Sequence, residues 1–184
     1  MSLDDELSDL LIISLEQAVA APYCGLLLAS AGARVIKVER PEGDFARSYD
    51  NSINGKSAIF AWLNRGKESI SLDLKNKTDK KIFKNMLKKA DVFLSNLTPG
   101  SLEKLELDYK QVKALNPKLI FCEITGYGNS KLAHSKKAYD FLIQAESGLC
   151  SVTGTEKYPS KVGISITDLS TGLTAYSAIL RGII

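Results

Sequence analysis

Short runs of strand-forming residues alternate with helical runs through most of this 184-residue chain, and the alternation limits the folds open to it. The first unit consists of an apolar run at 10–15, a helical segment at 22–33 and a second strand-like run at 34–39. Such units place consecutive strands parallel in one sheet, with helices against its faces. The sequence therefore predicts an α/β fold with a Rossmann-like, open, mostly parallel sheet and helices on both faces.

The same criteria locate the remaining elements. Strands are predicted at 70–74, 91–94 and 119–124, and helices at 78–90, after 101, after 108, at 138–147 and at 168–184. The expected N-caps are Thr78, Ser101 and Asp108. No element is assigned to 48–66, and the segments 126–137 and 151–163 are expected to be loops.

Bulk properties exclude several classes of protein. The net charge of +3 is too small for a nucleic-acid-binding protein, and no apolar run reaches the ~18 residues of a membrane span. Cys24, Cys122 and Cys150 are isolated and odd in number, so neither a disulfide framework nor a zinc site follows. A single histidine, His134, excludes an intrachain site that needs two. We expect a cytoplasmic protein without metal, nucleic acid or membrane among its partners.

Polar residues that follow the predicted strands fall on one edge of the sheet. Open parallel sheets bind ligands outside the carboxyl ends of their strands, which brings together Arg40, 72–75 and 96–98. This edge would be cationic and suit a ligand with several phosphates, because four basic residues gather there: Arg40, Lys75, Lys104 and Lys137. The first turn, 16–21, lacks the glycines of a nicotinamide- or flavin-binding loop, so such a site is not favoured.

Asp168 stands at the start of the last helical run, sixteen residues before the chain ends. Backbone N–H groups and the helix dipole at such a position are expected to hold a carboxylate ionised. An ionised carboxylate can act as a nucleophile, although capping the helix is the commoner role of an aspartate there. Both interpretations of Asp168 remain open from the residues alone.

Characteristic segments stand in a fixed order along the chain. The first is Ala-Gly-Ala-Arg-Val-Ile-Lys-Val-Glu-Arg-Pro at 31–41, and a later one is Ala-Asp-Val-Phe-Leu-Ser-Asn-Leu-Thr-Pro-Gly at 90–100. Others lie at 69–75, 115–121, 125–128, 139–148 and 166–172. As a set these segments resemble the class III CoA-transferase family, which includes formyl-CoA transferase, carnitine CoA-transferases and α-methylacyl-CoA racemases.

The resemblance implies a reaction and a role for Asp168. In these transferases the matching aspartate attacks an acyl-CoA thioester, a mixed anhydride forms, and the CoA thiolate leaves but stays bound. An aspartyl-CoA thioester then passes CoA to an acceptor carboxylate. The expected substrates are an acyl-CoA and a small carboxylic acid, and no cofactor is expected to be bound permanently.

The resemblance also implies where CoA lies. The matching positions along the sheet edge are Val19, Ala20, Arg40, Leu72, Lys75, Asn96, Leu97, Thr98, Lys104 and Lys137. The phosphates and adenosine would contact the basic members of this set. Two further residues, Tyr139 and Asp140, would line the thioester end.

One difference separates the branches of the family. The racemases carry a histidine directly before the aspartate of a His-Asp motif, as one of two proton-transfer groups. Tyr139 occupies that position here, and His134 lies five residues earlier. The sequence therefore favours CoA transfer, with an α-methylacyl-CoA racemase or epimerase as the alternative.

Family members are about twice as long as this chain, and the resemblance ends shortly after the aspartate motif. Residues 1–184 would then be the N-terminal part of the CoA-binding large domain, without the small domain and the return of the chain. Full-length members form interlocked homodimers, which we expect of the complete protein. A third hypothesis is an inactive fragment that binds CoA or assembles with another chain.

Overall fold

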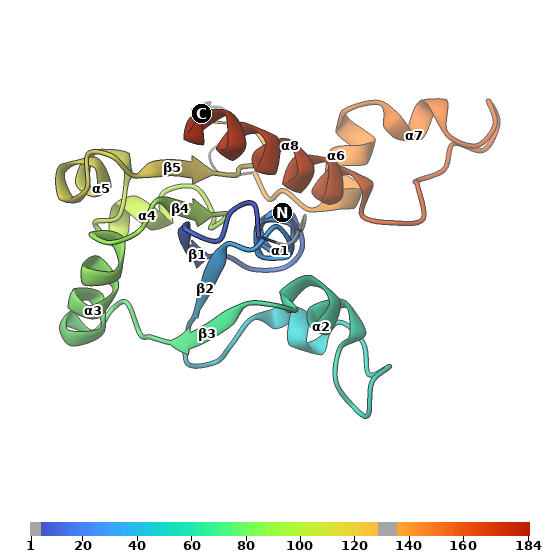
Figure 1. Cartoon of the computed structure of the whole chain (residues 1–184). Coiled ribbons are helices and arrows are strands. Elements are labelled where there is room, and N and C mark those ends of the chain that lie inside the picture. Colours follow the sequence, from blue (N-terminus) through green and yellow to red (C-terminus); the bar gives the residue numbers. More distant parts are fainter. Residues whose placement is uncertain (1–4, 129–135) are drawn as a thin grey trace.

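A five-stranded parallel sheet forms the centre of the computed structural model, which describes residues 5–128 and 136–184 (Figure 1). The strand order is β3-β2-β1-β4-β5, and every neighbouring pair is parallel. The strands are β1 (Leu11–Leu15), β2 (Arg34–Glu39), β3 (Glu68–Ser71), β4 (Val92–Ser95) and β5 (Ile120–Glu123). The predicted α/β class and parallel sheet are confirmed.

Helices connect the strands and complete the chain. Those before β4 are α1 (Ala20–Ser30), the 3₁₀-helix η1 (Phe45–Ser48), α2 (Ala58–Asn64) and α3 (Lys77–Leu87). Those after it are α4 (Ser101–Lys104), α5 (Tyr109–Leu115), α6 (Asp140–Glu146), α7 (Leu149–Val152) and α8 (Ile166–Ile183). The sequence analysis missed α2, which lies in the unassigned segment 48–66, and α7, which the patterns did not reveal.

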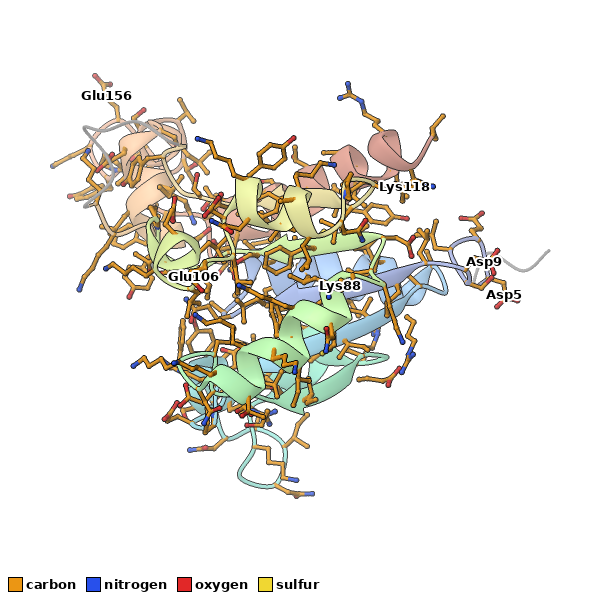
Figure 2. All side chains as sticks on the ribbon, turned by 90° about the vertical axis from the view of Figure 1, so that its left-hand side faces the viewer. Asp5, Asp9, Lys88, Glu106, Lys118 and Glu156 are labelled. Carbon is orange, nitrogen blue, oxygen red and sulfur yellow. The ribbon has the colours of Figure 1, made fainter. Side chains whose placement is uncertain are left out.

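Two apolar clusters show that helices cover both faces of the sheet, as predicted. On one face Phe83 and Leu87 of α3 pack in a cluster with Phe93 of β4. On the other face Cys24 of α1 and Ile179 of α8 belong to a cluster that includes Val92 of β4. Neighbouring residues of β4 thus serve opposite clusters, because successive side chains of a strand point to opposite faces. Figure 2 looks onto α3 from the solvent side, where charged side chains such as Lys88 are displayed.

The helix caps differ from the prediction at two places. Asn76, rather than Thr78, caps α3, and its Oδ1 accepts hydrogen bonds from the N–H groups of Thr78 and Asp79 at 2.8 and 3.4 Å. Ser101 is the first residue of α4 instead of its cap, and Gly100 precedes it with a left-handed φ of 81°. Asp108 caps α5 as predicted. The predicted caps are thus displaced by two residues at α3 and by one residue at α4, because asparagine, threonine, serine and glycine are all favoured at helix starts.

Some expectations concern absences or residues outside the described ranges. His134 lies in the segment 129–135, outside the described residues. Among residues 5–128 and 136–184, no helix combines the length and apolar character needed to cross a membrane. The same residues contain no group of three or more histidine, cysteine or acidic side chains that could hold a metal ion. The three cysteines form no disulfide.

The packing of α8 on α1 depends on one glycine. A Cβ atom added at Gly172 would lie 2.6 Å from the carbonyl oxygen of Ala20 and 3.1 Å from Cδ1 of Tyr23. The first of these atoms belongs to backbone, so a side chain at 172 requires the two helices to separate. Asp168 lies one turn before Gly172 on the same side of α8. The close approach at Gly172 therefore fixes the position of Asp168 relative to the start of α1.

We expect Gly172→Ala to lower the free energy of unfolding by about 1–3 kcal/mol, because overpacking outweighs the higher helix propensity of alanine. Gly182→Ala in the same helix is the matched control. The three nearest atoms to its Cβ would be side-chain atoms of Ile120, at 3.3 to 3.6 Å, and none of them belongs to backbone. Urea unfolding of the two variants should show a loss for the first and an unchanged or higher stability for the second. Equal stabilities would contradict the role given to Gly172.

Candidate active site

A pocket of about 200 Å³ opens at the carboxyl ends of β1 to β4. Its walls are largely apolar and include Leu15, Val38, Leu72, Leu74, Leu97 and Leu105. Arg40 and Lys75 also line it, and both are exposed to solvent. Four acidic residues line it as well: Glu16, Glu39, Asp44 and Asp73. Its apolar area suits a flat or apolar group, and the two exposed cations suit phosphates at its rim.

The structure brings some of the predicted CoA-binding residues to this pocket and leaves others outside it. Four of the predicted set line the pocket: Arg40, Leu72, Lys75 and Leu97. Three are exposed and do not line it: Thr98, Lys104 and Lys137. The other members of the set lie near the start of α1, after β4 or beside α8, as described below.

Asn96 uses its side chain to hold backbone. Its Oδ1 accepts from the N–H of Gln17 at 2.9 Å, and its Nδ2 donates to the carbonyl oxygen of Gln17 at 2.8 Å. Asn96 follows β4, and Gln17 follows the neighbouring strand β1. The amide of Asn96 therefore joins the ends of the two strands, and Gln17 is in turn part of the pocket wall.

The loop 16–19 between β1 and α1 has an unusual backbone conformation. Ala18 adopts a φ of 63°, in the left-handed region that residues with a Cβ rarely occupy. The N–H of Ala18 donates to Oδ1 of Asp44 at 3.2 Å. Val19 and Ala20, predicted to contact CoA, follow directly and are buried at the start of α1. Gln17 and Asp44 were missed by the sequence analysis, because no motif marks a residue that acts through distant backbone.

Asp168 is the third residue of α8 and not its N-cap. Asp140 of α6 supplies the capping oxygen instead. Its Oδ1 accepts from the backbone N–H groups of Thr167 and Asp168 at 2.8 and 3.3 Å, and from the Thr167 hydroxyl at 2.6 Å. The backbone N–H groups expected to stabilise Asp168 are therefore occupied by another carboxylate.

Asp140 is itself held in place. Nε2 of Gln144 donates to Oδ2 of Asp140 at 2.6 Å, and Oε1 of Gln144 accepts from the N–H of Val162 at 2.8 Å. Gln144 is fully buried. Together these contacts tie α6 to the segment that leads into α8, so they fix the position of the first turn that carries Asp168. Tyr139, which precedes α6, has an exposed side chain.

The environment of Asp168 raises its pKa, which overturns the expectation of a stabilised carboxylate. Burial and then the negative charge of Asp140 raise the pKa of Asp168 to about 6. Burial also opposes ionisation of Asp140, but the hydrogen bonds from Thr167, Gln144 and Asp168 outweigh it and lower the pKa of Asp140. The two carboxyl groups therefore titrate in opposite directions from their ordinary values, a pattern typical of sites with acid–base or nucleophilic chemistry.

The phenol of Tyr49, which follows η1, also has a shifted pKa. Burial raises the pKa of its phenol to about 12, and the charges of Asp44 and Asp168 add to the shift. Asp44 lines the pocket, whereas Asp168 stands on α8.

Comparisons with known proteins agree on one family. The model of CoA-transferase family III matches residues 7–184. The chain is 39% identical to the succinyl-CoA:glutarate CoA-transferase of Mus musculus over 94% of its own length, and 39% identical to the acetyl-CoA:oxalate CoA-transferase of Acetobacter aceti over 92%. A crystal structure of a CAIB/BAIF family protein from Brucella suis superposes with a TM-score of 0.89 at 37% identity and covers 95% of the chain.

The chain spans less than half the length of these relatives. The matches cover 40% of the mouse protein, 44% of the Acetobacter protein and 48% of the Brucella chain. The family model nevertheless covers nearly all residues of this chain, and the fold agrees over the same length. The chain belongs to CoA-transferase family III, as the resemblance of its segments indicated.

Proposed function

We propose that this protein transfers CoA from an acyl-CoA thioester to a carboxylic acid, with Asp168 as the nucleophile. The observation that supports this most directly is the environment of the Asp168 carboxyl. It is largely buried, and within the described residues its pKa is shifted only by burial and by Asp140. A carboxylate without a cationic partner keeps its charge available for attack.

The pocket supports CoA as the ligand. Its apolar interior suits the adenine ring, and Arg40 and Lys75 suit the phosphates. We propose Leu72 and Leu97 as wall contacts, with Lys104 and Lys137 as further cations that meet the phosphates. Val19, Ala20, Tyr139 and Asp140 would then line the path toward Asp168. Thr98 would contact CoA outside the pocket, and Asn96 would act through Gln17.

The proposed reaction proceeds through acyl transfers at Asp168. Its carboxylate attacks the thioester carbonyl and the carbon–sulfur bond breaks. CoA leaves as a thiolate, and the acyl group remains on Asp168 as a mixed anhydride. The thiolate attacks the aspartyl carbonyl, which releases the first carboxylic acid and leaves an aspartyl-CoA thioester. The acceptor carboxylate then displaces CoA, and the thiolate attacks the new acyl group, which regenerates Asp168. Each step requires an oriented nucleophile, which is a carboxylate in two steps and the bound CoA thiolate in the other two.

The names of the relatives suggest the class of acid. The similar proteins act, by name, on succinyl-CoA with glutarate and on acetyl-CoA with oxalate. We propose a dicarboxylic acid as one of the partners of this protein. We further propose that residues 1–184 belong to a CoA-binding large domain, and that the complete protein is a cytoplasmic homodimer. The three cysteines, none of them in a disulfide, are consistent with a reducing compartment.

Replacement of Asp168 tests the reaction. We expect Asp168→Ala to reduce transfer of CoA from succinyl-CoA to glutarate by about 10³-fold or more in the full gene product, because the proposed anhydride forms on the carboxyl that is removed. Asp9→Ala serves as the control, because it removes an exposed carboxylate that lies before β1 and outside the candidate site. Full activity of Asp168→Ala would refute the proposal.

The pH dependence tests the state of Asp168. Only the ionised carboxyl attacks, and its pKa is raised to about 6. We therefore expect kcat/KM for succinyl-CoA to fall about tenfold per pH unit below pH 6 and to level off above it. The profile is measured between pH 4.5 and pH 8, with glutarate kept well above saturation. A rate that is constant down to pH 5 would contradict a nucleophile with a raised pKa.

The same shift predicts a cost in stability. A carboxyl whose folded pKa is above its unfolded value of about 3.9 destabilises the fold once both states are ionised, that is above about pH 6. Asp168→Asn should therefore raise the free energy of unfolding at pH 8 by about 1 kcal/mol, a value reduced for the partial exposure of the group. The gain should disappear near pH 4. The measurement is chemical denaturation of the wild type and Asp168→Asn at pH 8 and at pH 4. An equal rise in the free energy of unfolding at both pH values would attribute the effect to packing instead of charge.

A further inference from the structure

Four charged side chains lie buried together at the loop 16–19, of which one belongs to the loop and three to other segments. They are Glu16, Lys37, Asp44 and Lys67, and each side chain is at most 1% exposed. Lys37 Nζ lies 2.7 Å from Asp44 Oδ2 and 3.7 Å from Glu16 Oε1, and Lys67 Nζ lies 2.5 Å from Glu16 Oε1. Two cations thus balance two anions away from solvent.

Each charge has further partners. The Ser14 hydroxyl donates to Glu16 at 2.5 Å, and Lys67 donates to the carbonyl oxygen of Pro22 at 2.8 Å. Burial opposes ionisation of Glu16, but the charges of Lys67 and Lys37 outweigh it and lower the pKa of Glu16. Buried ion pairs of this kind contribute little net stability compared with apolar packing, because desolvation offsets their attraction. The cluster therefore calls for an explanation in terms of geometry.

The cluster is connected to the loop by hydrogen bonds to its backbone. Oδ1 of Asp44 accepts from Ala18 N–H at 3.2 Å and from Ala46 N–H at 2.9 Å, while Oδ2 is held by Lys37. Asn96 holds both backbone groups of Gln17 from the other side. Ala18 stays in its left-handed conformation between these two restraints. A strained backbone persists only where its surroundings hold it, and such positions gather at functional sites.

The loop lies between the two parts of the candidate site. On one side Gln17 lines the pocket. On the other side the carbonyl oxygen of Ala20 lies against Gly172, one turn from Asp168. A displacement of the loop therefore changes the separation between a ligand in the pocket and the Asp168 carboxyl. Acyl transfer is sensitive to such a separation, and a misplacement of about 1 Å can cost about 100-fold in rate.

We infer that Asp44, anchored by Lys37, and Asn96 are positioning residues: together they fix the loop 16–20 and so set the distance between the CoA pocket and the Asp168 carboxylate. The inference rests on the proposed CoA transfer. It separates two contributions to the reaction. The cations at the pocket opening hold the ligand, whereas the buried acceptors beneath the loop determine how the bound thioester meets the nucleophile.

The test measures kcat and KM separately in the full gene product, with succinyl-CoA and glutarate as substrates. Asp44→Ala should lower kcat by about 10- to 100-fold. Asp44 itself lines the pocket and Asn96 does not, so KM is compared in Asn96→Ala, where KM for succinyl-CoA should stay within about threefold of the wild type. Adding Ala18→Gly should restore at least part of kcat, because glycine adopts a positive φ without a restraint. Asn96→Ala should reproduce the loss of kcat, and it tests the inference even where Asp44→Ala does not fold.

Asp108→Ala is the matched control, because Asp108 also accepts from two backbone N–H groups, those of Lys110 and Gln111, at the start of α5. It should leave kcat unchanged. Wild-type kcat in Asp44→Ala and Asn96→Ala, or a rise in KM with kcat intact, would overturn the inference. So would a loss of kcat in Asp44→Ala that Ala18→Gly fails to reverse.

Hydrogen exchange followed by mass spectrometry separates this inference from the proposed function. The amides of 16–20 should exchange faster in Asp44→Ala and Asn96→Ala than in the wild type, and Asp108→Ala should leave them unchanged. If the wild-type enzyme is inactive, the proposed CoA transfer is refuted. The exchange rates of the amides of 16–20 still show whether Asp44 and Asn96 restrain the loop. Unchanged exchange in both variants would overturn the positioning role, whatever the activity.

Discussion

The parallel pairing of β1 with both β2 and β4 is the constraint on which the rest of the structure depends. The chain builds the sheet outward from β1 to β3 on one side and then crosses to β4 and β5 on the other. All strands therefore end at the same edge, and the direction of building reverses between β1 and β4, where open α/β sheets form a crevice. Asn96 and Gln17, which follow these two strands, meet across that reversal. The pocket and the loop 16–19 both result from this one feature of topology.

Much of the fold was predictable because its signals are local. The strands are short apolar runs, and the ends of β1, β2, β4 and β5 lie within one residue of their predicted positions. β3 begins two residues and ends three residues earlier than predicted, because its pairing with β2 begins at Glu68 opposite Ile36. The short helices α2 and α7 were not predicted, because seven and four residues carry little periodic signal. The equally short α4 and α5 were predicted from the turn and capping residues that precede them. Packing against neighbours, rather than local preference, decides whether such segments are helical.

The candidate site was predictable only in part, for a related reason. Arg40 and Lys75 could be placed at the strand ends because the sheet rule depends on sequence order alone. The state of Asp168 could not be predicted, because its helix is capped by Asp140, which lies 28 residues earlier in the chain. The helix dipole favours a carboxylate, but burial beside a second negative charge is the stronger effect here. Tertiary partners of this kind have no signature in a single sequence.

Gly25 of α1 couples three positions that are far apart in the sequence. A Cβ atom there would lie 2.9 Å from Oε2 of Glu16 and 3.0 Å from Nζ of Lys67. The absence of a side chain at 25 leaves the space in which Glu16, after β1, and Lys67, before β3, form their ion pair. A side chain at 25 would displace the buried carboxylate of Glu16 and the ammonium group of Lys67 from each other, unless the residues at 16 and 67 became smaller or lost their charges. In related chains we therefore expect these three positions to covary, so that a larger residue at 25 occurs with smaller or uncharged residues at 16 and 67.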